Sequence, residues 1–348
     1  MAEEKVKRTE LFELGEFGLI DKLTKDIKIK HEGTVKGVGD DAAVLDMKGK
    51  LTLVTTDLLI EGVHFDMTYT PLKHLGYKAA VVNFSDIIAM NGIPKQMTIS
   101  ISVSNRYSLE ALEELYSGVM LACEKYNVDL VGGDTTSSLH GLYISVTAVG
   151  EVSNDSVVYR NTAKKGDLIC VTGDLGAAYM GLLILEREKQ AFKADPNLQP
   201  DLEGEEYIIG RQLKPEARLD ILKVLDGIKV KPTAMIDISD GLASDIMHIC
   251  MDSGLGCRLF EDKLPVSQKV MKAAMQFEIS STTAALNGGE DYELLFTIAQ
   301  KDHEKLKDVM GISVIGHMTE KQEGMSIVAD NGEQIELKAQ GWDGLKRE

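Results

Sequence analysis

Alternation of apolar and polar residues predicts several β-strands in the first half of the chain. Residues 51–57, LTLVTTD, are rich in β-branched side chains and end in an aspartate. In QMTISISV, residues 96–103, every second residue is apolar, so one side of this strand is expected to be buried. The same pattern recurs in a further expected strand at Leu142, Ile144, Val146 and Ala148.

A longer period predicts two helices between these strands. From Pro71 to Asn91, apolar residues recur every three or four positions. Ser108 is expected to cap a second helix, with Glu110 in its first turn. The expected core face of this second helix consists of Leu109, Leu112, Leu115, Val119 and Cys123. Strands mixed with long helices are typical of an α/β or α+β fold.

The sequence becomes polar and turn-rich at residues 150–165, where we expect a domain boundary. The second half repeats the mixture: strands at LICVTG, TAMIDISD, CRLF, YELLFTI and ISVIG, and helices near 176–190, near 215–226 and from Leu242. A charged loop, 191–206, lies between the first two of these helices. We therefore expect an N-terminal domain over residues 1–152 and a C-terminal α/β domain over 153–348.

Charge narrows the range of partners. The 348 residues carry a formal net charge of −17, with 44% hydrophobic and 27% charged residues. A surface this acidic repels nucleic acid and anionic lipid, so neither is expected as a partner. If the protein binds phosphates, a cation must lie between the acidic protein and the phosphate groups, and a divalent metal is the first candidate.

The termini and cysteines favour the cytoplasm. The first ten residues lack the apolar stretch of a secretory signal, and no uninterrupted apolar run reaches the length of a membrane span. The four cysteines form no CxxC pair, so we expect free thiols in a reducing compartment. A disulfide between Cys250 and Cys257 is the less favoured alternative.

The common nucleotide-binding motifs are absent. No GxxxxGK[ST] segment is present, and GLGCRL at 254–259 lacks the third glycine of a dinucleotide fingerprint. No HRD-type loop indicates a protein kinase, and no HExxH or CxxC indicates zinc.

Aspartates at the ends of expected elements stand out instead, each beside apolar or small residues. They are Asp41, Asp57, Asp86, Asp134, Asp237 and Asp240. Taken singly, each is explained as a helix cap or a turn residue. Together they form the oxygen-rich set that suits Mg²⁺ bound through a few carboxylates and substrate phosphates. Two Gly-Gly-acid turns, 132–134 and 288–290, would let backbone amides approach a phosphate.

Eight segments, in order and over nearly the full length, carry a resemblance to a known family. They are GEFGLI, GVGDDAAV, TTDLLIEGVHF, YKAAVVNFSDIIAM, LVGGDTT, IDISDGLASD, NGGEDYELLF and GWDG. The chain resembles the thiamine-monophosphate kinases, within the aminoimidazole-ribonucleotide-synthetase-like superfamily. The resemblance implies two domains, with N-terminal sheets paired across a homodimer and a C-terminal α/β domain closing over the nucleotide. It also implies transfer of the ATP γ-phosphoryl group to thiamine monophosphate, with several Mg²⁺ ions.

The resemblance also assigns residues. Its implied metal ligands are Asp41, Thr55, Thr56, Asp57, Asp86, Asp134, Asp237 and Asp240. Its implied ATP contacts are Gly133, Asp134, Arg160 and Ser239, and its implied contacts to the thiamine part are His64, Glu290 and Trp342. A carboxylate and an aromatic face are suitable partners for the positive thiazolium ring. No general base is implied, because the acceptor is already an anionic phosphate oxygen.

Simpler explanations remain for several of these residues. His64 is also consistent with an ordinary half-buried histidine, Trp342 with an anchor for the tail, and Arg160 with any neighbouring carboxylate. In GVGDDAAV we expect Asp41 to bind metal and Asp40 to shape the turn or support the site.

Two alternative functions remain. Another ATP-dependent synthetase of the superfamily is possible, above all the purine-pathway aminoimidazole ribonucleotide synthetase, although TTDLLIEGVHF and NGGEDYELLF favour the thiamine branch. A selenophosphate synthetase is disfavoured, because the first cysteine, Cys123, lies in an expected helix. A non-catalytic protein that binds divalent ions is the second alternative, but no EF-hand loop is present.

Overall fold

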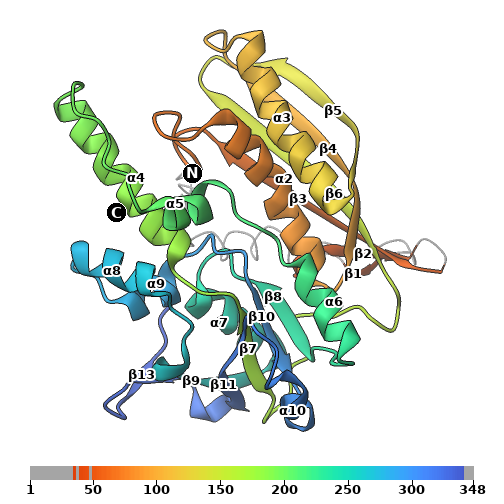
Figure 1. Ribbon diagram of the computed structural model, residues 1–348. Coiled ribbons are helices and arrows are strands. Elements are labelled where there is room, and N and C mark those ends of the chain that lie inside the picture. Colours follow the sequence, from red (N-terminus) through yellow and green to blue (C-terminus); the bar gives the residue numbers. More distant parts are fainter. Residues whose placement is uncertain (1–33, 37–38, 47–48, 341–348) are drawn as a thin grey trace, which may run out of the picture.

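Two mixed sheets with helices packed on them make up the computed structural model (Figure 1). The structure describes residues 34–36, 39–46 and 49–340. The segment GEFGLI and Trp342 lie outside the described residues, so the predictions about them stay open. Within the described chain, none of the helices is both long and apolar enough to cross a bilayer.

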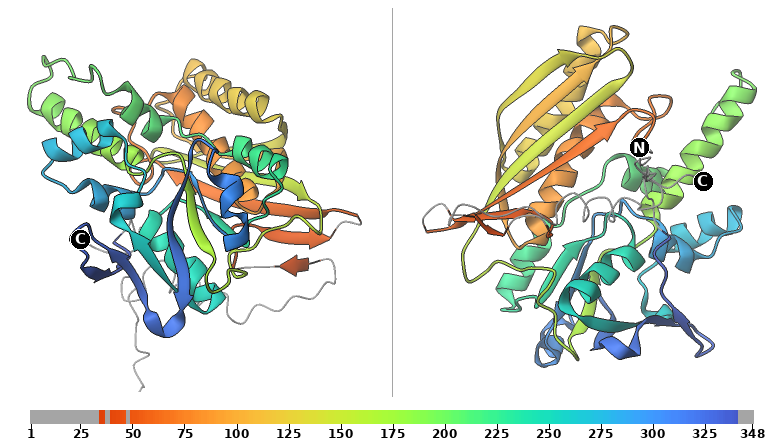
Figure 2. Two further views of the ribbon diagram at one scale, coloured as in Figure 1. Left: turned by 60° about the horizontal axis from the view of Figure 1, so that its bottom comes forward. Right: turned by 180° about the vertical axis from the view of Figure 1, so that it is seen from behind.

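The N-terminal sheet has six described strands in the order β1-β2-β3-β6-β4-β5. Its neighbouring strands are antiparallel except for the β4–β5 pair, which is parallel. The strands are β1 (Thr34–Lys36), β2 (Ala43–Asp46), β3 (Leu51–Ile60), β4 (Ile93–Val103), β5 (Asp129–Ser137) and β6 (Leu142–Val152). Two helices, α2 (Leu72–Ala89) and α3 (Leu109–Tyr126), pack together on one face. Seen from behind, the other face is covered by none of the described helices, and we call it the open face (Figure 2).

The second sheet has seven described strands in the order β13-β12-β9-β11-β7-β10-β8. They are β7 (Leu168–Thr172), β8 (Ala234–Asp237), β9 (Leu255–Phe260), β10 (Leu294–Ile298), β11 (Ile312–Glu320), β12 (Met325–Val328) and β13 (Gln334–Glu336). The α-helices of this half are α4 (Ala177–Ala194), α5 (Glu206–Leu213), α6 (Leu219–Gly227), α7 (Leu242–Ser253), α8 (Gln268–Gln276), α9 (Ser281–Asn287) and α10 (His303–Leu306). Both halves thus have the mixed α/β composition that the sequence predicted.

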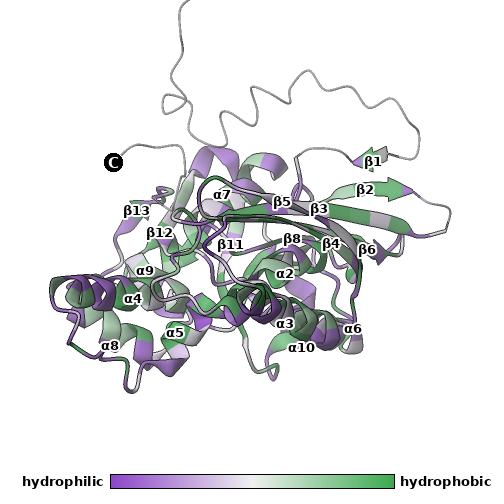
Figure 3. Ribbon diagram, turned by 90° about the horizontal axis from the view of Figure 1, so that it is seen from above, coloured by the Kyte–Doolittle hydropathy of each residue, from purple (hydrophilic) through white to green (hydrophobic). Residues whose placement is uncertain are grey.

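Helix α2 lies between the two sheets and is almost entirely buried. It packs on β3, β4 and β6 of the first sheet and on β8 of the second. Fourteen of its eighteen residues are buried. A helix that is apolar on nearly all sides belongs inside a core, and α2 therefore joins the two halves. The outer helix α4, by contrast, shows alternating hydrophilic and hydrophobic patches (Figure 3).

Alternation along the strands of the second sheet divides its side chains between two cores. Met235 on β8, Cys170 on β7 and Phe296 on β10 face the core that contains α2. The residues on either side of Met235, Ala234 and Ile236, face the opposite core. Because side chains alternate along a strand, Asp237 at the end of β8 points to the same side as Met235, toward α2.

The prediction of a Gly-Gly-acid turn at residues 132–134 was wrong. These residues lie within β5, the edge strand parallel to β4. A Cβ atom on Gly133 would lie 1.9 Å from the carbonyl oxygen of Ile99, so glycine is needed for β5 to approach β4. The second predicted turn, residues 288–290, lies outside helices and strands directly after α9, with Gly289 at φ 70°.

The second helix of the first half begins as predicted, but its core face starts later. The Ser108 side chain accepts a hydrogen bond from the Ala111 amide, as an N-cap does. Leu115, Val119 and Cys123 are buried, whereas Leu109 is 67% exposed, because it precedes the part of the helix that contacts α2. Leu112 is only partly buried.

Candidate active site

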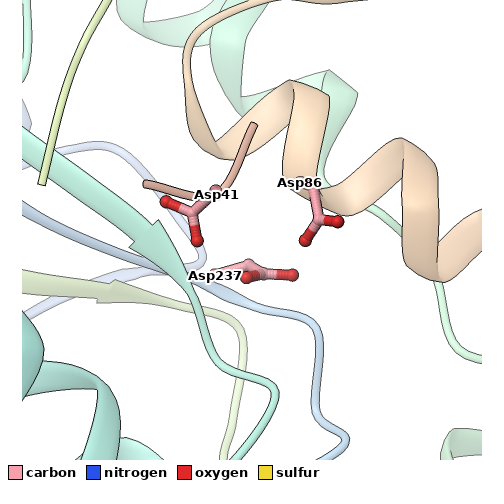
Figure 4. A group of neighbouring side chains, drawn as sticks. All are labelled: Asp41, Asp86 and Asp237. Atoms are coloured by element: carbon pink, nitrogen blue, oxygen red, sulfur yellow. The ribbon is translucent and has the colours of Figure 1, made fainter. Parts of the chain in front are cut away.

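Three aspartates from distant parts of the chain meet at the junction of the two halves (Figure 4). Asp41 comes from the turn before β2, Asp86 from α2, and Asp237 from the end of β8. Each offers one carboxylate oxygen, and these oxygens all lie within 4.8 Å of one another. Of the six predicted aspartate ligands, all of which are described, these three form the group that is compact enough to hold one ion together.

Local structure explains why these carboxylates converge. Asp237 points toward α2 because it continues the alternation of β8, and Asp86 lies on the part of α2 between the sheets. Hydroxyl groups orient both side chains. Thr55 Oγ1 donates to Asp86 Oδ2 at 2.6 Å, and the Ser85 hydroxyl donates to Asp237. The sheet of each half therefore contributes to one cluster.

Burial makes the ionised form of these groups costly. It is the first cause of the raised pKa of Asp41, Asp86 and Asp237, and neighbouring carboxylates raise the pKa of Asp41 and Asp86 further. The pKa of Asp57 rises to about 6, through burial and then through the charge of Asp237. A compact set of buried carboxylates is costly unless protons or cations neutralise it.

One cation of the described chain contacts this cluster. Arg160, from the segment between the two sheets, places Nη2 3.0 Å from Asp41 Oδ1. Asp41 Oδ2 is buried, and within the part of the chain that the structure describes it has no hydrogen-bond partner. A buried carboxylate oxygen of this kind, on a side chain grouped with two further carboxylates, fits a hard divalent cation such as Mg²⁺. The donors present therefore fit the metal that the sequence predicted.

Asp40 has a different environment from Asp41. Its Oδ1 accepts a hydrogen bond from the Asp41 amide at 3.1 Å, which shapes the turn. The same carboxylate lies 3.6 Å from Arg160 Nε and 3.7 Å from Lys36 Nζ. Asp40 thus orders the turn and the arginine, while Asp41 enters the cluster.

Residues 55–57 on β3 divide between the two faces of the sheet. Thr55 and Asp57 lie on the face covered by α2, together with the buried Leu53 and Leu59. Thr56 lies on the open face, where its hydroxyl donates to the Val146 carbonyl at 2.9 Å. The side chain of Thr56 is therefore not near the three aspartates, whereas Thr55 and Asp57 are.

Gly133 and Asp134 are also apart from the cluster. In the strand register, Asp134 lies opposite Ser100, Ser100 opposite Ser145, and Ser145 opposite Leu58. Three strand spacings thus separate Asp134 from β3, on the order of 14 Å. Asp134 is exposed on the edge strand. A single chain does not bring it to the other predicted ligands.

The turn after β8 carries Ser239 and Asp240, both partly buried. The Ser239 carbonyl accepts a hydrogen bond from the Glu290 amide at 2.7 Å, which joins this turn to the second Gly-Gly turn. Asp245, five residues further on, was not among the predicted site residues. It is 1% exposed, its Oδ2 has no hydrogen-bond partner among the described residues, and burial raises its pKa well above the usual range. The sequence feature that could have identified Asp245 is its place as the third acidic residue of the segment IDISDGLASD.

His64 and Glu290 lie near each other at a second part of the junction. Burial lowers the pKa of His64, and the nearby charge of Glu290 opposes this effect. His64 Nδ1 accepts a hydrogen bond from the Ile60 amide at 3.0 Å. Glu290 binds Lys78 and Gln212, neither of which was predicted as a site residue. Lys78 stands between apolar and small residues within the expected helix 71–91, and this placement was the signal for it.

Comparison with known proteins places the chain in a class and then in a family. Residues 39–152 match the family model described as AIR synthase related protein, N-terminal domain, and residues 164–329 match the corresponding C-terminal domain. Two such domains in one chain define the class of AIR synthase related proteins.

Full-length relatives narrow this class. The chain is 37% identical over 332 residues to thiamine-monophosphate kinase of Aquifex aeolicus, covering 95% of this chain and 98% of the relative. It is 32% identical to the Bacillus subtilis protein of the same name, covering 96% and 100%. A solved structure described as AaThiL complexed with AMPPCP and TMP has a TM-score of 0.83 at 36% identity, covering 97% of this chain and 99% of that one. The chain belongs to the thiamine-monophosphate kinase family, a family of phosphotransferases.

Proposed function

We propose that this protein transfers the γ-phosphoryl group of ATP to thiamine monophosphate, giving thiamine diphosphate and ADP. The observation that carries the proposal is the Asp41–Asp86–Asp237 cluster, which lies at the junction of the two halves in a member of this family. The relative solved with AMPPCP and TMP, by its description, binds an ATP analogue and TMP. The proposed reaction uses both kinds of ligand.

The acidic cluster has a physical role in this reaction. Two polyanions must meet inside a protein of net charge −17, which requires cations. Mg²⁺ bound there would neutralise phosphate charge and align the attacking and leaving oxygens. We propose that Asp41, Asp86 and Asp237 hold it together with Thr55, Asp57 and Asp240. The acceptor oxygen is already anionic, so positioning and charge neutralisation replace a general base.

We propose that the remaining residues hold the two substrates. Arg160 can release Asp41 to metal and pair with an ATP phosphate, since a guanidinium suits phosphate geometry. Ser239 is proposed as a further ATP contact. Glu290 would pair with the positive thiazolium ring, and His64 beside it would line the same site. Trp342 stays a predicted contact to the thiamine part.

We also propose that the active form is a homodimer in the cytoplasm. Gly133, Asp134 and the side chain of Thr56 lie on the edge strand or the open face of the N-terminal sheet, away from the cluster. On the same surface, Leu58 and Val131 are 51% and 61% exposed. Pairing two such sheets would cover these residues and bring Asp134 near a second chain. Use of ATP, with all four cysteines buried as free thiols, favours the cytoplasm.

The direct test is an assay of the purified protein with ATP, Mg²⁺ and thiamine monophosphate. Chromatography is expected to show thiamine diphosphate and ADP in equal amounts, and chelation of Mg²⁺ should stop their formation. The Aquifex aeolicus relative, run in parallel, controls for the assay conditions. No product from this protein, with the relative active, would refute the proposed function.

A further inference from the structure

The two oxygens of the Glu290 carboxylate are held by side chains from different halves of the molecule. Lys78 Nζ, on α2, lies 2.9 Å from Glu290 Oε1. Gln212 Nε2, on α5, donates to Glu290 Oε2 at 2.7 Å. Lys78 Nζ also donates to the Gln212 carbonyl at 3.1 Å. The three residues form a closed set of contacts, which we call the Glu290 clamp.

The clamp is not an ordinary surface ion pair. The Lys78 side chain is 6% exposed, although it carries a charge, and the Gln212 residue is 6% exposed. A buried ammonium is tolerated only when its hydrogen bonds are satisfied, and here Glu290 and the Gln212 carbonyl satisfy two of them. The Glu290 side chain is 32% exposed, so its carboxylate is accessible from one side.

The backbone at Glu290 needs support from its surroundings. Glu290 has φ 57° and Tyr292 has φ 51°, in the left-handed region that residues other than glycine rarely adopt. The Glu290 amide is bound to the Ser239 carbonyl, which fixes the backbone. The side chain has several rotatable bonds, and Lys78 and Gln212 hold its end in one place.

We propose that Lys78 and Gln212 are positioning residues, which aim the Glu290 carboxylate at the positively charged ring of thiamine monophosphate. Lys78 comes from the N-terminal half and Gln212 from the C-terminal half. The ring-binding site is therefore complete only when the two halves are docked as they are here. A carboxylate has about four acceptor directions, and the clamp occupies two of them. The proposal rests on the proposed function, since it assigns the purpose of Glu290 in that reaction.

Kinetics of the variant Lys78→Met test the clamp, because methionine keeps much of the volume and removes the charge and the donors. We expect the KM for thiamine monophosphate to rise about tenfold or more, while the KM for ATP stays within about twofold. Calorimetric titration with thiamine monophosphate should show the same loss of affinity without turnover. Lys78→Arg should recover part of it. Lys73→Met, an exposed lysine on the same helix, is the matched control and should match wild type.

A double-mutant cycle separates positioning from a merely structural role. If Lys78 acts through Glu290, Lys78→Met should add little to the loss already caused by Glu290→Gln. Gln212→Leu should raise the same KM by a smaller factor, which keeps the test available if Lys78→Met does not fold. Equal effects of Lys78→Met with and without Glu290, or an unchanged KM in both Lys78→Met and Gln212→Leu, would overturn the clamp. Absence of wild-type turnover would instead overturn the proposed function.

Discussion

Adjacent residues of one turn have separate tasks in this protein. Asp40 accepts a hydrogen bond from the amide of Asp41 and orders Arg160, while Asp41 places a carboxylate oxygen beside those of Asp86 and Asp237. The adjacent carboxylates of Asp40 and Asp41 would repel each other, but their side chains have different neighbours. The turn presents one carboxylate and is held by the other.

At the residue scale, Asp57→Asn should separate catalysis from folding. The variant removes a carboxylate whose ionisation is costly above its pKa of about 6. Without metal at neutral pH, its free energy of unfolding should therefore match or exceed that of wild type by up to about 3 kcal/mol. Turnover should fall by at least about 100-fold. Asp226→Asn, an exposed site on α6, is the control. Near-normal turnover of Asp57→Asn would contradict its role as a ligand.

Stabilisation by Mg²⁺ should depend on pH in a defined direction. A carboxyl with a raised pKa, such as Asp57, favours the folded state at low pH, and this contribution is lost as the pH rises through about 6. Above that range the ionised cluster destabilises the metal-free protein and attracts Mg²⁺. The rise in melting temperature on adding Mg²⁺ should be small near pH 5 and larger near pH 8. An equal rise at both values would count against the cluster as the metal site.

At the element scale, the pattern of apolar and polar residues predicted those features that depend on contacts within a single helix or strand. The span of α2, the Ser108 cap and the alternating face of β4 all follow from local sequence. Residues 132–134 were read wrongly because glycine favours turns, whereas here Gly133 permits a close contact with β4. That contact depends on the parallel partner of β5, which no local pattern reveals.

Gly133→Ala is the test of this close contact. The added methyl group would lie 1.9 Å from the Ile99 carbonyl, so β5 must move away from β4. We expect a loss of about 2–4 kcal/mol in the free energy of unfolding, measured by denaturant titration. Gly132→Ala is the matched neighbour, because its added methyl would lie 3.9 Å from a Thr98 methyl. Similar stability of the two variants would show that β5 accommodates a side chain at either position.

At the scale of the whole molecule, the candidate site depends on how the halves meet. The aspartates could be selected from sequence, since each stands beside apolar or small residues. Their grouping could not, because it depends on α2 lying between the two sheets. For the same reason Lys78 and Gln212 were missed, as their partner lies in a distant segment. Asp134 is the opposite case. It was predicted as a metal ligand from the sequence, but within one chain it lies apart from the other predicted ligands.

Mixing two inactive variants tests whether Asp134 serves a second chain. Asp134→Asn and Asp237→Asn should each abolish turnover alone. If Asp134 completes the partner's site, a mixed dimer regains one intact site of two, and a random equal mixture should recover about one quarter of wild-type activity. If both residues serve the same chain, the mixture stays inactive. Sedimentation of each variant, before and after mixing, verifies that dimers form and exchange.

The rigid helix between the sheets has a further consequence, for the length of substrate that the protein accepts. Lys78 and Asp86 are eight residues apart on α2, which corresponds to an axial rise of about 12 Å. One end of this span lies by the Glu290 clamp, which we propose binds the cationic ring, and the other lies at the carboxylates that we propose hold the metal beside the phosphates. A packed helix does not change its length, so α2 fixes the distance between Lys78 and Asp86. We expect thiamine diphosphate, longer by one phosphate, to be rejected as an acceptor even though its ring is the same.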